Sequence, residues 1–412
     1  MNRLFVWIRL ADATLRLVGE LGTTDPSPYN GHFRSEFEYA RDWTDWSGAF
    51  ALDPESLPLN TSSRRFNGEL FHPPLSVFDD SLPDDWGRAL LSALLRSEGR
   101  RSTPVEMLLR MRGGGTGALI FGETPAPPET TGTVRSTALN ALLRAADKFE
   151  AGTLPLNDEF RKLIEGSSRA GGARPKALAH DANGEWLIKF PSSSRDAGHD
   201  VVALEATCLL LGRRAGLEVP DARLITLGKR RALMVRRFDV TPHSGRLHMI
   251  SLRTLCRERP GVYIHSYSNL AGAVRKHSAS PAADVAALFR HMVFNAAIGN
   301  VDDHLKNFWM LAKPEGYRLA PAFDLVPDIA ERGEHSLFFQ ASSGCPSRAD
   351  LLELARAWGI QKGPDIIAEV VAAVDSFTAS ARKFDVRGVK SLERISKDIR
   401  RRAVRLDGAA GS

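Results

Sequence analysis

The spacing of apolar and polar residues along the chain predicts a mixture of strands and helices. Alternating stretches at 185–190 and 231–236 are typical of strands. A helix is expected over 200–215, where the side chain of Asp200 could cap the first turn. The clearest helical period runs from 284 to 298, with its apolar residues on one face. A part with strands is therefore expected to precede a helical part.

A Pro- and Thr-rich stretch at 123–133 interrupts these patterns. Proline fixes the backbone and removes a hydrogen-bond donor, so this stretch is interpreted as a surface linker. The residues before it begin with strand-like alternation and become helical at about 83–112. The expected division is a first subdomain over 1–122, the linker over 123–137, a mixed α/β part over 138–240 and a helical lobe over 241–412.

Composition excludes several classes of protein. Of 412 residues, 43% are hydrophobic and 25% are charged, as in an ordinary globular protein and unlike a disordered chain. The three cysteines are far apart and form no Cys-x-x-Cys pair, which excludes a zinc ribbon and suits a reducing compartment. The apolar run at 4–8 is too short to cross a membrane. We therefore expect a cytoplasmic protein without a membrane partner.

Two glycine-rich segments resemble nucleotide-binding motifs only superficially. The stretch 113–118 formally matches Gly-x-Gly-x-x-Ala, but a helical pattern precedes it and a strand-like one follows, the reverse of a dinucleotide-binding unit. A flexible turn is the expectation there. The stretch 165–176 has two glycines at the spacing of a P-loop, but Gly172 stands where that motif requires lysine. Its glycines and basic residues could still cover phosphates, although an ordinary surface loop is the alternative.

Candidate chemistry centres on residues 302–307, after the predicted helix. Asp302 and Asn307 have the spacing of the kinase catalytic loop, Asp-x-x-x-x-Asn, in which the Asp accepts a hydroxyl proton and the Asn binds metal. A predicted hairpin with its turn at 313–316 would bring Asn307 beside Asp324. Carboxylate and amide oxygens together suit Mg²⁺. The alternative is a polar turn whose Asp and Asn side chains cap backbone groups.

A kinase also needs a strand lysine for the phosphates and a helix glutamate to hold it. Lys189 lies on the strand predicted at 185–190, and Glu205 lies in the following helix. The alternatives are a solvated strand face for Lys189 and an exposed helix position for Glu205.

Basic residues gather near the end of the chain. The net charge is only 55 − 49 = +6, but the segment from Arg382 to Arg405 contains ten basic residues and only three acidic ones. If this segment is helical, much of the charge falls on one face. The members of that face are Arg394, Lys397, Arg400, Arg401 and Arg405. A solvated helix face is the simpler interpretation, and contact with DNA phosphates is the other.

Taken in order, these segments resemble the HipA family of bacterial toxin–antitoxin serine/threonine kinases. The resemblance covers nearly the whole chain. The motifs that carry it are Gly-Gly-Ala-Arg-Pro-Lys (171–176), Leu-Ile-Lys-Phe-Pro (187–191), Leu-Glu (204–205) with Gly-Leu-Glu-Val-Pro (216–220), Arg-Arg-Phe-Asp (236–239), Asp-Asp-His-Leu-Lys-Asn (302–307) and Pro-Ala-Phe-Asp (321–324). The resemblance implies an α+β, two-lobed, protein/lipid-kinase-like fold with an extra N-terminal subdomain and an all-helical C-terminal lobe.

The resemblance also implies roles for individual residues. Asp302 would be the catalytic base, Asn307 and Asp324 the magnesium ligands, and Glu205 the partner of Lys189. The residues implied to contact ATP are Gly171, Gly172, Ala173, Arg174, Pro175, Lys176, Lys189, Arg236, Arg237, Phe238, His304, Leu305, Lys306, Asn307, Phe323 and Asp324. Among them, the backbone of 236–238 would form the adenine hinge.

One position departs from the family pattern. HipA-like kinases are inactivated by autophosphorylation of a serine seven residues before the loop lysine, and that position here is Arg169. The neighbouring hydroxyls are Ser168 and Ser167, of which Ser168 is the preferred candidate.

The resulting hypothesis is a Mg-ATP-dependent protein serine/threonine kinase, the toxin of a type II toxin–antitoxin module. It would phosphorylate a cytosolic protein, with aminoacyl-tRNA synthetases among the targets of the family. A HipB-like helix-turn-helix antitoxin and operator DNA would be its partners, with the basic C-terminal stretch on the DNA. Two alternatives stay open: a catalytically vestigial corepressor and a small-molecule phosphotransferase.

Overall fold

The computed structural model describes residues 2–25, 27, 33–59, 63–68, 76–111, 113–130, 132–167, 172–196, 198–257 and 265–408. The chain forms two compact units. The first consists of Met1–Ser192 and Arg236–Gly261, and the second of Ser193–Val235 and Val262–Ser412. None of the helices in the described residues is both long enough and apolar enough to span a membrane.

The first unit begins with an antiparallel sheet whose strand order is β4-β3-β2-β1-β5. Its strands are β1 (Asn2–Arg9), β2 (Leu15–Thr23), β3 (Ser35–Tyr39), β4 (Arg65–Asn67) and β5 (Leu119–Gly122). Leu4, Val6 and Ile8 of β1 are buried, as a half-buried strand requires. Beyond this sheet, β6 (Val134–Arg135) pairs in parallel with β7 (Lys176–Asp181), and β7 pairs antiparallel with β8 (Gly184–Lys189).

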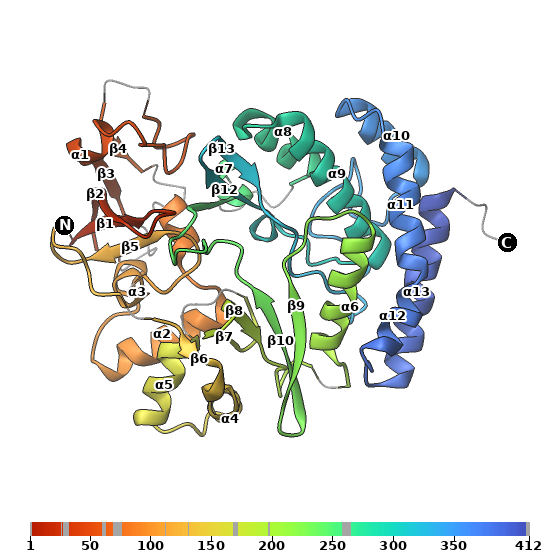
Figure 1. The fold of residues 1–412 in the computed structure, drawn as a ribbon, viewed down its shortest axis with the longest axis horizontal. Coiled ribbons are helices and arrows are strands. Elements are labelled where there is room, and N and C mark those ends of the chain that lie inside the picture. The colour runs from red at the N-terminus through yellow and green to blue at the C-terminus, as the bar shows by residue number, and fades with distance from the viewer. Residues whose placement is uncertain are drawn as a thin grey trace. The chain divides into compact units, whose positions relative to one another are not determined.

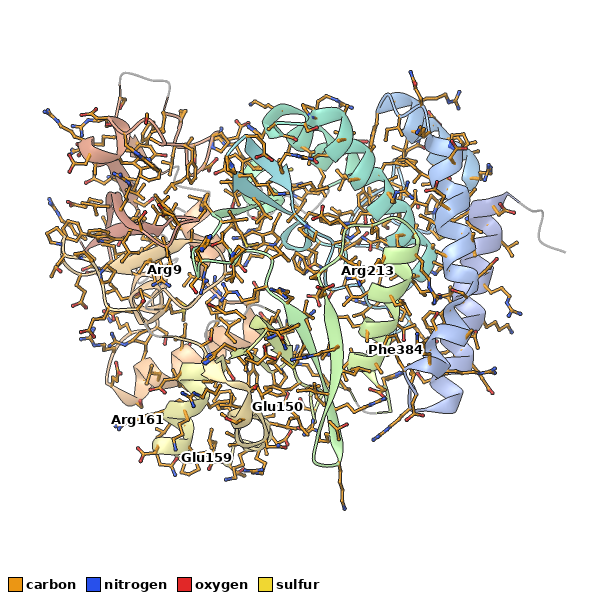
Figure 2. All side chains as sticks on the ribbon, viewed as in Figure 1. Arg9, Glu150, Glu159, Arg161, Arg213 and Phe384 are labelled. Carbon is orange, nitrogen blue, oxygen red and sulfur yellow. The ribbon has the colours of Figure 1, made fainter. Side chains whose placement is uncertain are left out.

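Short helices complete the first unit (Figure 1). They are α1 (Arg41–Thr44), α2 (Asp85–Ser97), α3 (Pro104–Met111), α4 (Leu139–Glu150), α5 (Asp158–Ser167) and α7 (Leu252–Leu255), the last of which follows the short strand β11 (Met249–Ser251). The helical stretch expected at 83–112 is two helices, because Gly99 adopts φ +70° just after α2. Lys148 of α4 binds Glu159 of α5 at 2.7 Å, and Figure 2 labels Glu159 on its helix.

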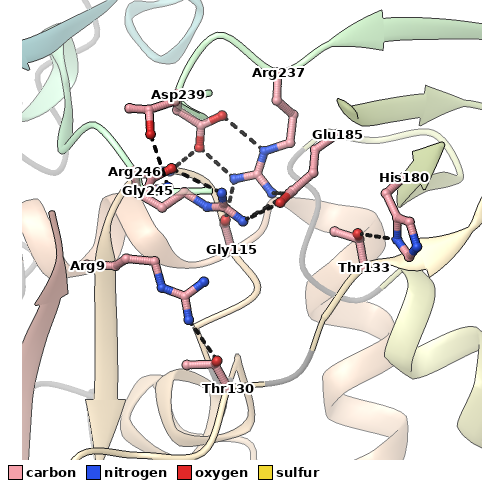
Figure 3. A network of polar contacts seen from close by, with 12 residues as sticks. Arg9, Gly115, Thr130, Thr133, His180, Glu185, Arg237, Asp239, Gly245 and Arg246 are labelled. Atoms are coloured by element: carbon pink, nitrogen blue, oxygen red, sulfur yellow. Dashed lines mark hydrogen bonds and ion pairs between the residues drawn. The ribbon is translucent and has the colours of Figure 1, made fainter. Parts of the chain in front are cut away.

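The second half of the predicted linker is attached to the first unit. Thr130 accepts a hydrogen bond from Arg9, and Thr133 is 2.9 Å from His180 of β7 (Figure 3). The linker then ends in the strand β6. Proline cannot donate a backbone hydrogen bond. In this stretch, threonine hydroxyl groups make the bonds to the first unit instead.

A buried ion cluster anchors the turn at 113–118 (Figure 3). Arg237 binds Asp239 at 2.6 Å and the carbonyl of Gly115 at 2.9 Å, while the backbone N–H of Gly117 donates to Asp239. Burial raises the pKa of Asp239, but Arg237, Arg246 and the Gly117 N–H together lower it further, so the net shift is downward. The turn expected from the glycines is present, and these bonds attach it to the buried cluster.

The second unit is mainly helical and contains two hairpins. Its helices are α6 (Val201–Arg214), α8 (Tyr267–His277), α9 (Pro281–Ile298), α10 (Arg348–Ala357), α11 (Gly363–Asp375), α12 (Phe377–Lys383) and α13 (Val389–Asp407). Its hairpins are β9 (Ala222–Leu227) with β10 (Arg230–Arg236), and β12 (Trp309–Lys313) with β13 (Gly316–Leu319).

Helix α9 lies at the centre of the second unit. It packs against α8, α11 and α13 and is buried almost all round, as its high apolar content requires. The sequence placed the start of this helix at 284, and the structure begins it at Pro281, which suits the first turn of a helix. Helix α6 begins after Asp200, as predicted, but the Asp200 side chain makes no capping bond and instead forms an ion pair with Arg231.

Helix α13 holds the end of α9 through a buried arginine. The guanidinium of Arg402 binds Asp398 at 2.8 Å and lies against Gly299, where a Cβ atom would come within 2.9 Å of its Nε. Lys397, Arg400 and Arg401 of the same helix are exposed. The three arginines at 400–402 are therefore not equivalent, because one of them is part of the core.

We predict that Arg402→Gln lowers the free energy of unfolding by about 3 kcal/mol, since it leaves Asp398 without its buried partner. Arg400→Gln is the matched control and should change it by less than about 0.5 kcal/mol. Urea unfolding of the two variants measures the difference. Equal stabilities would show that Arg402 does not anchor α9.

Candidate active site

The loop at 300–307 follows directly from the end of helix α9. Gly299 adopts φ +68° and ends the helix, and the backbone N–H of Asn300 then donates to the carbonyl of Asn295. Residues Leu305–Asn307 form a short 3₁₀ turn before β12. The buried side chain of Leu305 fixes this turn to the core.

Asp303 anchors the loop from inside. Its side chain is fully buried and accepts four hydrogen bonds. The donors are the Tyr267 hydroxyl (2.5 Å), Nδ1 of His335 (2.9 Å) and the backbone N–H groups of Ser336 (2.8 Å) and Leu337 (3.4 Å). A buried carboxylate with this many donors is strongly held, since moving it would leave several polar groups without partners.

Asp302 points the other way. Its side chain is 61% exposed, and Nη1 of Arg332 lies 3.4 Å from Oδ1. The Asn307 amide nitrogen donates to the backbone carbonyl of Asp302 at 2.5 Å, so the Asn307 side chain is oriented with Oδ1 as its remaining acceptor. The loop therefore presents one accessible carboxylate and one oriented amide oxygen.

Asp324 has an unusual backbone conformation. Its φ is +58°, a left-handed value that is uncommon outside glycine and concentrates at functional sites. Its carbonyl accepts a hydrogen bond from the side chain of Asn300 at 3.3 Å. This bond connects Asp324 to the start of the loop that carries Asp302.

The predicted hairpin is confirmed, but it does not pair Asn307 with Asp324. Lys313 is opposite Gly316 and the ladder runs to the pair Met310–Leu319, a register that would set Asn307 level with Ala322 if it continued. It does not continue, because the N–H of Ala322 donates to the carbonyl of Glu218 instead. The side-by-side pairing expected from the hairpin is therefore wrong.

The donor set suits a hard cation that is completed by other ligands. Asp302, Asn307 and Asp324 offer only oxygen atoms, the kind that Mg²⁺ prefers. Across the described residues, no three His, Cys, Asp or Glu side chains are grouped as in a metal site made by protein alone. A magnesium site that takes ligands from phosphate and water does not need such a group.

The other predicted site residues of the second unit differ in how exposed they are to solvent. His304 is exposed, and Lys306 and Phe323 are half-buried. Glu205 on α6 is 4% exposed, so the interpretation of an exposed helix residue is wrong.

In the first unit, two predicted lysines face each other. Lys176 of β7 is directly opposite Lys189 of β8, and the two residues are 5% and 6% exposed. Cross-strand partners in an antiparallel pair lie on the same face of the sheet, where like charges are unfavourable. The solvated strand face considered for Lys189 is therefore wrong.

Gly172 makes room for one of these lysines. A Cβ atom on Gly172 would lie 1.6 Å from Nζ of Lys176, and the residue has φ +103°. Its N–H donates to the Asp84 side chain, and its carbonyl accepts from the N–H of Trp86 at 3.2 Å. The start of α2 thus fixes the loop in front of the lysine pair, where Ala173 and Arg174 are half-buried and Pro175 is buried.

Two of the predicted loop residues, Gly171 and Ser168, lie outside the described residues. Ser167 is fully buried at the end of α5, and its hydroxyl has no hydrogen-bond partner within the described chain. Its hydroxyl is therefore not accessible in this structure.

The segment proposed as a hinge is divided between surface and core. Arg236 is exposed and Phe238 is half-buried, but Arg237 is buried in the ion cluster with Asp239. The backbone N–H of Arg237 donates to the carbonyl of Glu185. The Arg237 side chain therefore has a structural role in this cluster.

Comparison with protein families identifies both parts of the chain. Residues 168–378 match the HipA-like C-terminal domain, and residues 15–122 match the HipA N-terminal domain. The chain belongs to the HipA family. The α+β kinase-like fold expected from the sequence is confirmed with it.

Two curated relatives in this comparison come from Sinorhizobium fredii (strain NBRC 101917 / NGR234). The protein named "Putative kinase Y4dM" is 31% identical over 37% of this chain and 39% of its own length. The protein named "Putative kinase Y4mE" is 30% identical over 35% of this chain and 34% of its own length. This HipA-family chain thus spans well under half the length of either relative.

A solved structure covers nearly the whole chain. It belongs to the toxin–antitoxin system of Shewanella oneidensis MR-1, a complex of HipA, HipB and operator DNA. The match has 18% identity and a TM-score of 0.69, and it covers 99% of this chain and 100% of the other. At this identity the likeness establishes the fold.

The sequence did not reveal the buried polar residues behind the loop. Asp303 was visible only as the second residue of an Asp-Asp pair, and the pattern did not tell which carboxylate faces inward. Tyr267 and Asn295 lie on α8 and α9, where they looked like ordinary members of amphipathic helices. The one available signal was a polar residue on the apolar face of a buried helix.

His291 of α9 is a buried histidine whose protonation links the stability of the second unit to pH. It is buried, and its ring centre lies 4.8 Å from that of Phe308. Burial lowers its pKa to about 4. The unfolded chain would take up a proton near pH 6.5, so stability should fall as the pH is lowered from 6.5 towards 4.

We predict that His291→Gln reduces this dependence by about 1.4 kcal/mol per pH unit within that window. The matched control for the loss of a histidine is His243→Gln, at an exposed position. Urea unfolding at a series of pH values measures both. An unchanged slope in His291→Gln would contradict the assignment of a neutral buried imidazole.

Proposed function

We propose that this HipA-family chain is a Mg-ATP-dependent protein serine/threonine kinase and the toxin of a type II toxin–antitoxin module. One observation carries the proposal. In a single loop, Asp303 is buried and held, Asp302 is exposed, and the Asn307 amide is bonded to the carbonyl of Asp302. A loop that only capped backbone groups would not need an exposed carboxylate beside an oriented amide.

Asp302 is the proposed base. Its carboxylate accepts the proton of a serine or threonine hydroxyl while that oxygen bonds to the γ-phosphorus, and the bond from the phosphorus to the bridging oxygen of ADP breaks. Nη1 of Arg332 lies 3.4 Å from Oδ1 of Asp302. The exposure of Asp302 suits an acceptor hydroxyl on another protein.

Asn307 and Asp324 are the proposed ligands of Mg²⁺. When bound, the ion would neutralise charge on the phosphate oxygens. Asn307 offers Oδ1, because its nitrogen is already used. Asp324 offers a carboxylate from a backbone position fixed by Asn300.

Lys176 and Lys189 are proposed to bind the ATP phosphates, with Glu205 as the partner of Lys189. Both lysines are buried on neighbouring strands, and ammonium groups form charge-assisted hydrogen bonds with phosphate oxygens. The loop at 171–176 would cover the phosphates, and the backbone of 236–238 would contact adenine. His304 and Lys306 would complete the ATP contacts of the catalytic loop.

The proposed partners are a HipB-like antitoxin and operator DNA. The solved relative from Shewanella is a complex with both kinds of partner, which supports the proposal. Lys397, Arg400 and Arg401 are exposed on α13 and could approach DNA phosphates. Arg402 is excluded from this role by its burial, so a test of DNA contact should leave it unchanged. Ser168 remains the proposed site of autophosphorylation.

The kinase proposal predicts that Asp302→Asn abolishes phosphoryl transfer and keeps ATP binding within about threefold. The amide has the same shape but cannot accept the proton. Turnover and ATP affinity should be measured on the same preparation, with the exposed Asp365→Asn as the control for a lost surface carboxylate.

The outcomes of this experiment distinguish the alternatives. Undiminished turnover in Asp302→Asn would remove that residue from the mechanism. A wild-type protein that binds ATP but transfers no phosphate would favour the corepressor. Transfer to small hydroxyl compounds and not to protein would favour the small-molecule phosphotransferase.

The phosphate site leads to a prediction for Gly172→Ala. The added methyl group would occupy the space of Lys176 Nζ at a backbone conformation that alanine resists, so the lysine must move. We expect ATP affinity to fall at least tenfold. Gly132→Ala is the control, since open space surrounds that position. Equal ATP affinity in the two variants, measured by calorimetry, would argue against a phosphate role for Lys176.

A further inference from the structure

A continuous chain of buried hydrogen bonds runs behind the loop, from Asp303 to Asp324. The Tyr267 hydroxyl donates to Asp303 at 2.5 Å and accepts from Nδ2 of Asn295 at 3.1 Å. Oδ1 of Asn295 accepts from Nδ2 of Asn300 at 3.1 Å. The same amide nitrogen of Asn300 also donates to the carbonyl of Asp324, at 3.3 Å.

These four bonds form one connected network because Tyr267, Asn295 and Asn300 each take part in two of them. Tyr267 uses its hydrogen on one side and its oxygen on the other, and Asn300 uses both hydrogens of its amide. Burial and the nearby Asp303 carboxylate raise the pKa of Tyr267 well above its ordinary value, so the hydroxyl keeps the proton that it donates. The direction of every bond is therefore fixed.

The burial of this network is difficult to explain by stability alone. Tyr267 is 0% exposed, Asn295 1% and Asn300 2%, within the apolar surroundings of α8 and α9. Apolar side chains of similar volume could fill this space without the cost of removing amides and a hydroxyl from water. Polar groups fix the relative positions of the side chains, because a buried network in which every group is paired permits only one arrangement of them.

The two ends of the network show which geometry it defines. Asp303 is joined by a peptide bond to Asp302, the proposed base. At the other end, the bond is to the backbone of Asp324 itself, which is held at φ +58°. A left-handed aspartate persists only where its surroundings enforce it.

We propose that Tyr267, Asn295 and Asn300 are positioning residues that fix the distance and orientation of Asp324 relative to the loop carrying Asp302. They touch neither metal nor substrate. This inference rests on the proposed kinase function, because it assigns roles to residues behind the base and the metal ligand of that same site. Small displacements of reacting groups have large effects on rate, so loss of one link should reduce turnover much more than substrate binding.

Tyr267→Phe breaks the network with the loss of one oxygen atom. The matched control is Tyr39→Phe in the first unit, where another buried hydroxyl donates to the carbonyl of Leu57 and accepts from the N–H of Leu52. Each substitution removes one donated and one accepted bond. The two variants should therefore lose similar melting temperature and differ in catalysis.

The experiment measures kcat, the KM for ATP, the Mg²⁺ concentration for half-maximal activity and Tm. For Tyr267→Phe we expect kcat to fall 10- to 100-fold, KM to change less than threefold, and the Mg²⁺ requirement to rise several-fold. Tyr39→Phe should keep wild-type values of all three. Asn295→Leu breaks the same network at another link and should reproduce the Tyr267→Phe pattern, which keeps the test decisive if one variant fails to fold.

The inference is overturned if an active wild-type protein tolerates both Tyr267→Phe and Asn295→Leu with unchanged kcat and Mg²⁺ requirement. It is equally overturned if kcat falls in Tyr267→Phe only as much as in Tyr39→Phe. A wild-type protein without Mg²⁺-dependent phosphoryl transfer is a different outcome, because it contradicts the proposed function itself.

Discussion

The burial of the Asp303 carboxylate determines the arrangement of the loop at 300–307. Consecutive side chains in an extended segment point to opposite sides, so an inward Asp303 turns Asp302 outward. Four donors hold Asp303, among them the Tyr267 hydroxyl and His335. Without them the carboxylate would be buried without compensation, which is strongly unfavourable. The position of the exposed Asp302 is thus a consequence of its neighbour's contacts.

The strand pair of the first unit places two lysines together. Lys176 and Lys189 are opposite each other and largely removed from water. Gly172 lets the loop come close to Lys176, because any side chain would collide with it. The proposal that this strand pair contacts the phosphates of ATP rests on the two ammonium groups, which form charge-assisted hydrogen bonds with phosphate oxygens.

The sequence predicted those parts of the structure that depend on local periodicity and turn chemistry. The strand ending at Lys189, the helix ending at Ile298 and the hairpin at 309–319 are present with nearly the expected bounds. It could not predict properties that depend on tertiary contacts. The bond from Ala322 to Glu218 ends the hairpin earlier than expected, and the ion pair with Arg231 takes Asp200 away from its helix cap. Likewise, only the packing distinguishes buried Arg402 from exposed Arg400.

We propose that this chain transfers phosphate from Mg-ATP to protein hydroxyl groups. The most direct test incubates the purified protein with bacterial extract and γ-labelled ATP, with Mg²⁺ or with EDTA, and measures acid-stable phosphate bound to proteins. We predict that label appears on serine or threonine of at least one extract protein, only with Mg²⁺. Complete absence of protein-bound label in the presence of Mg²⁺, from a preparation that is folded and binds ATP, would contradict the account.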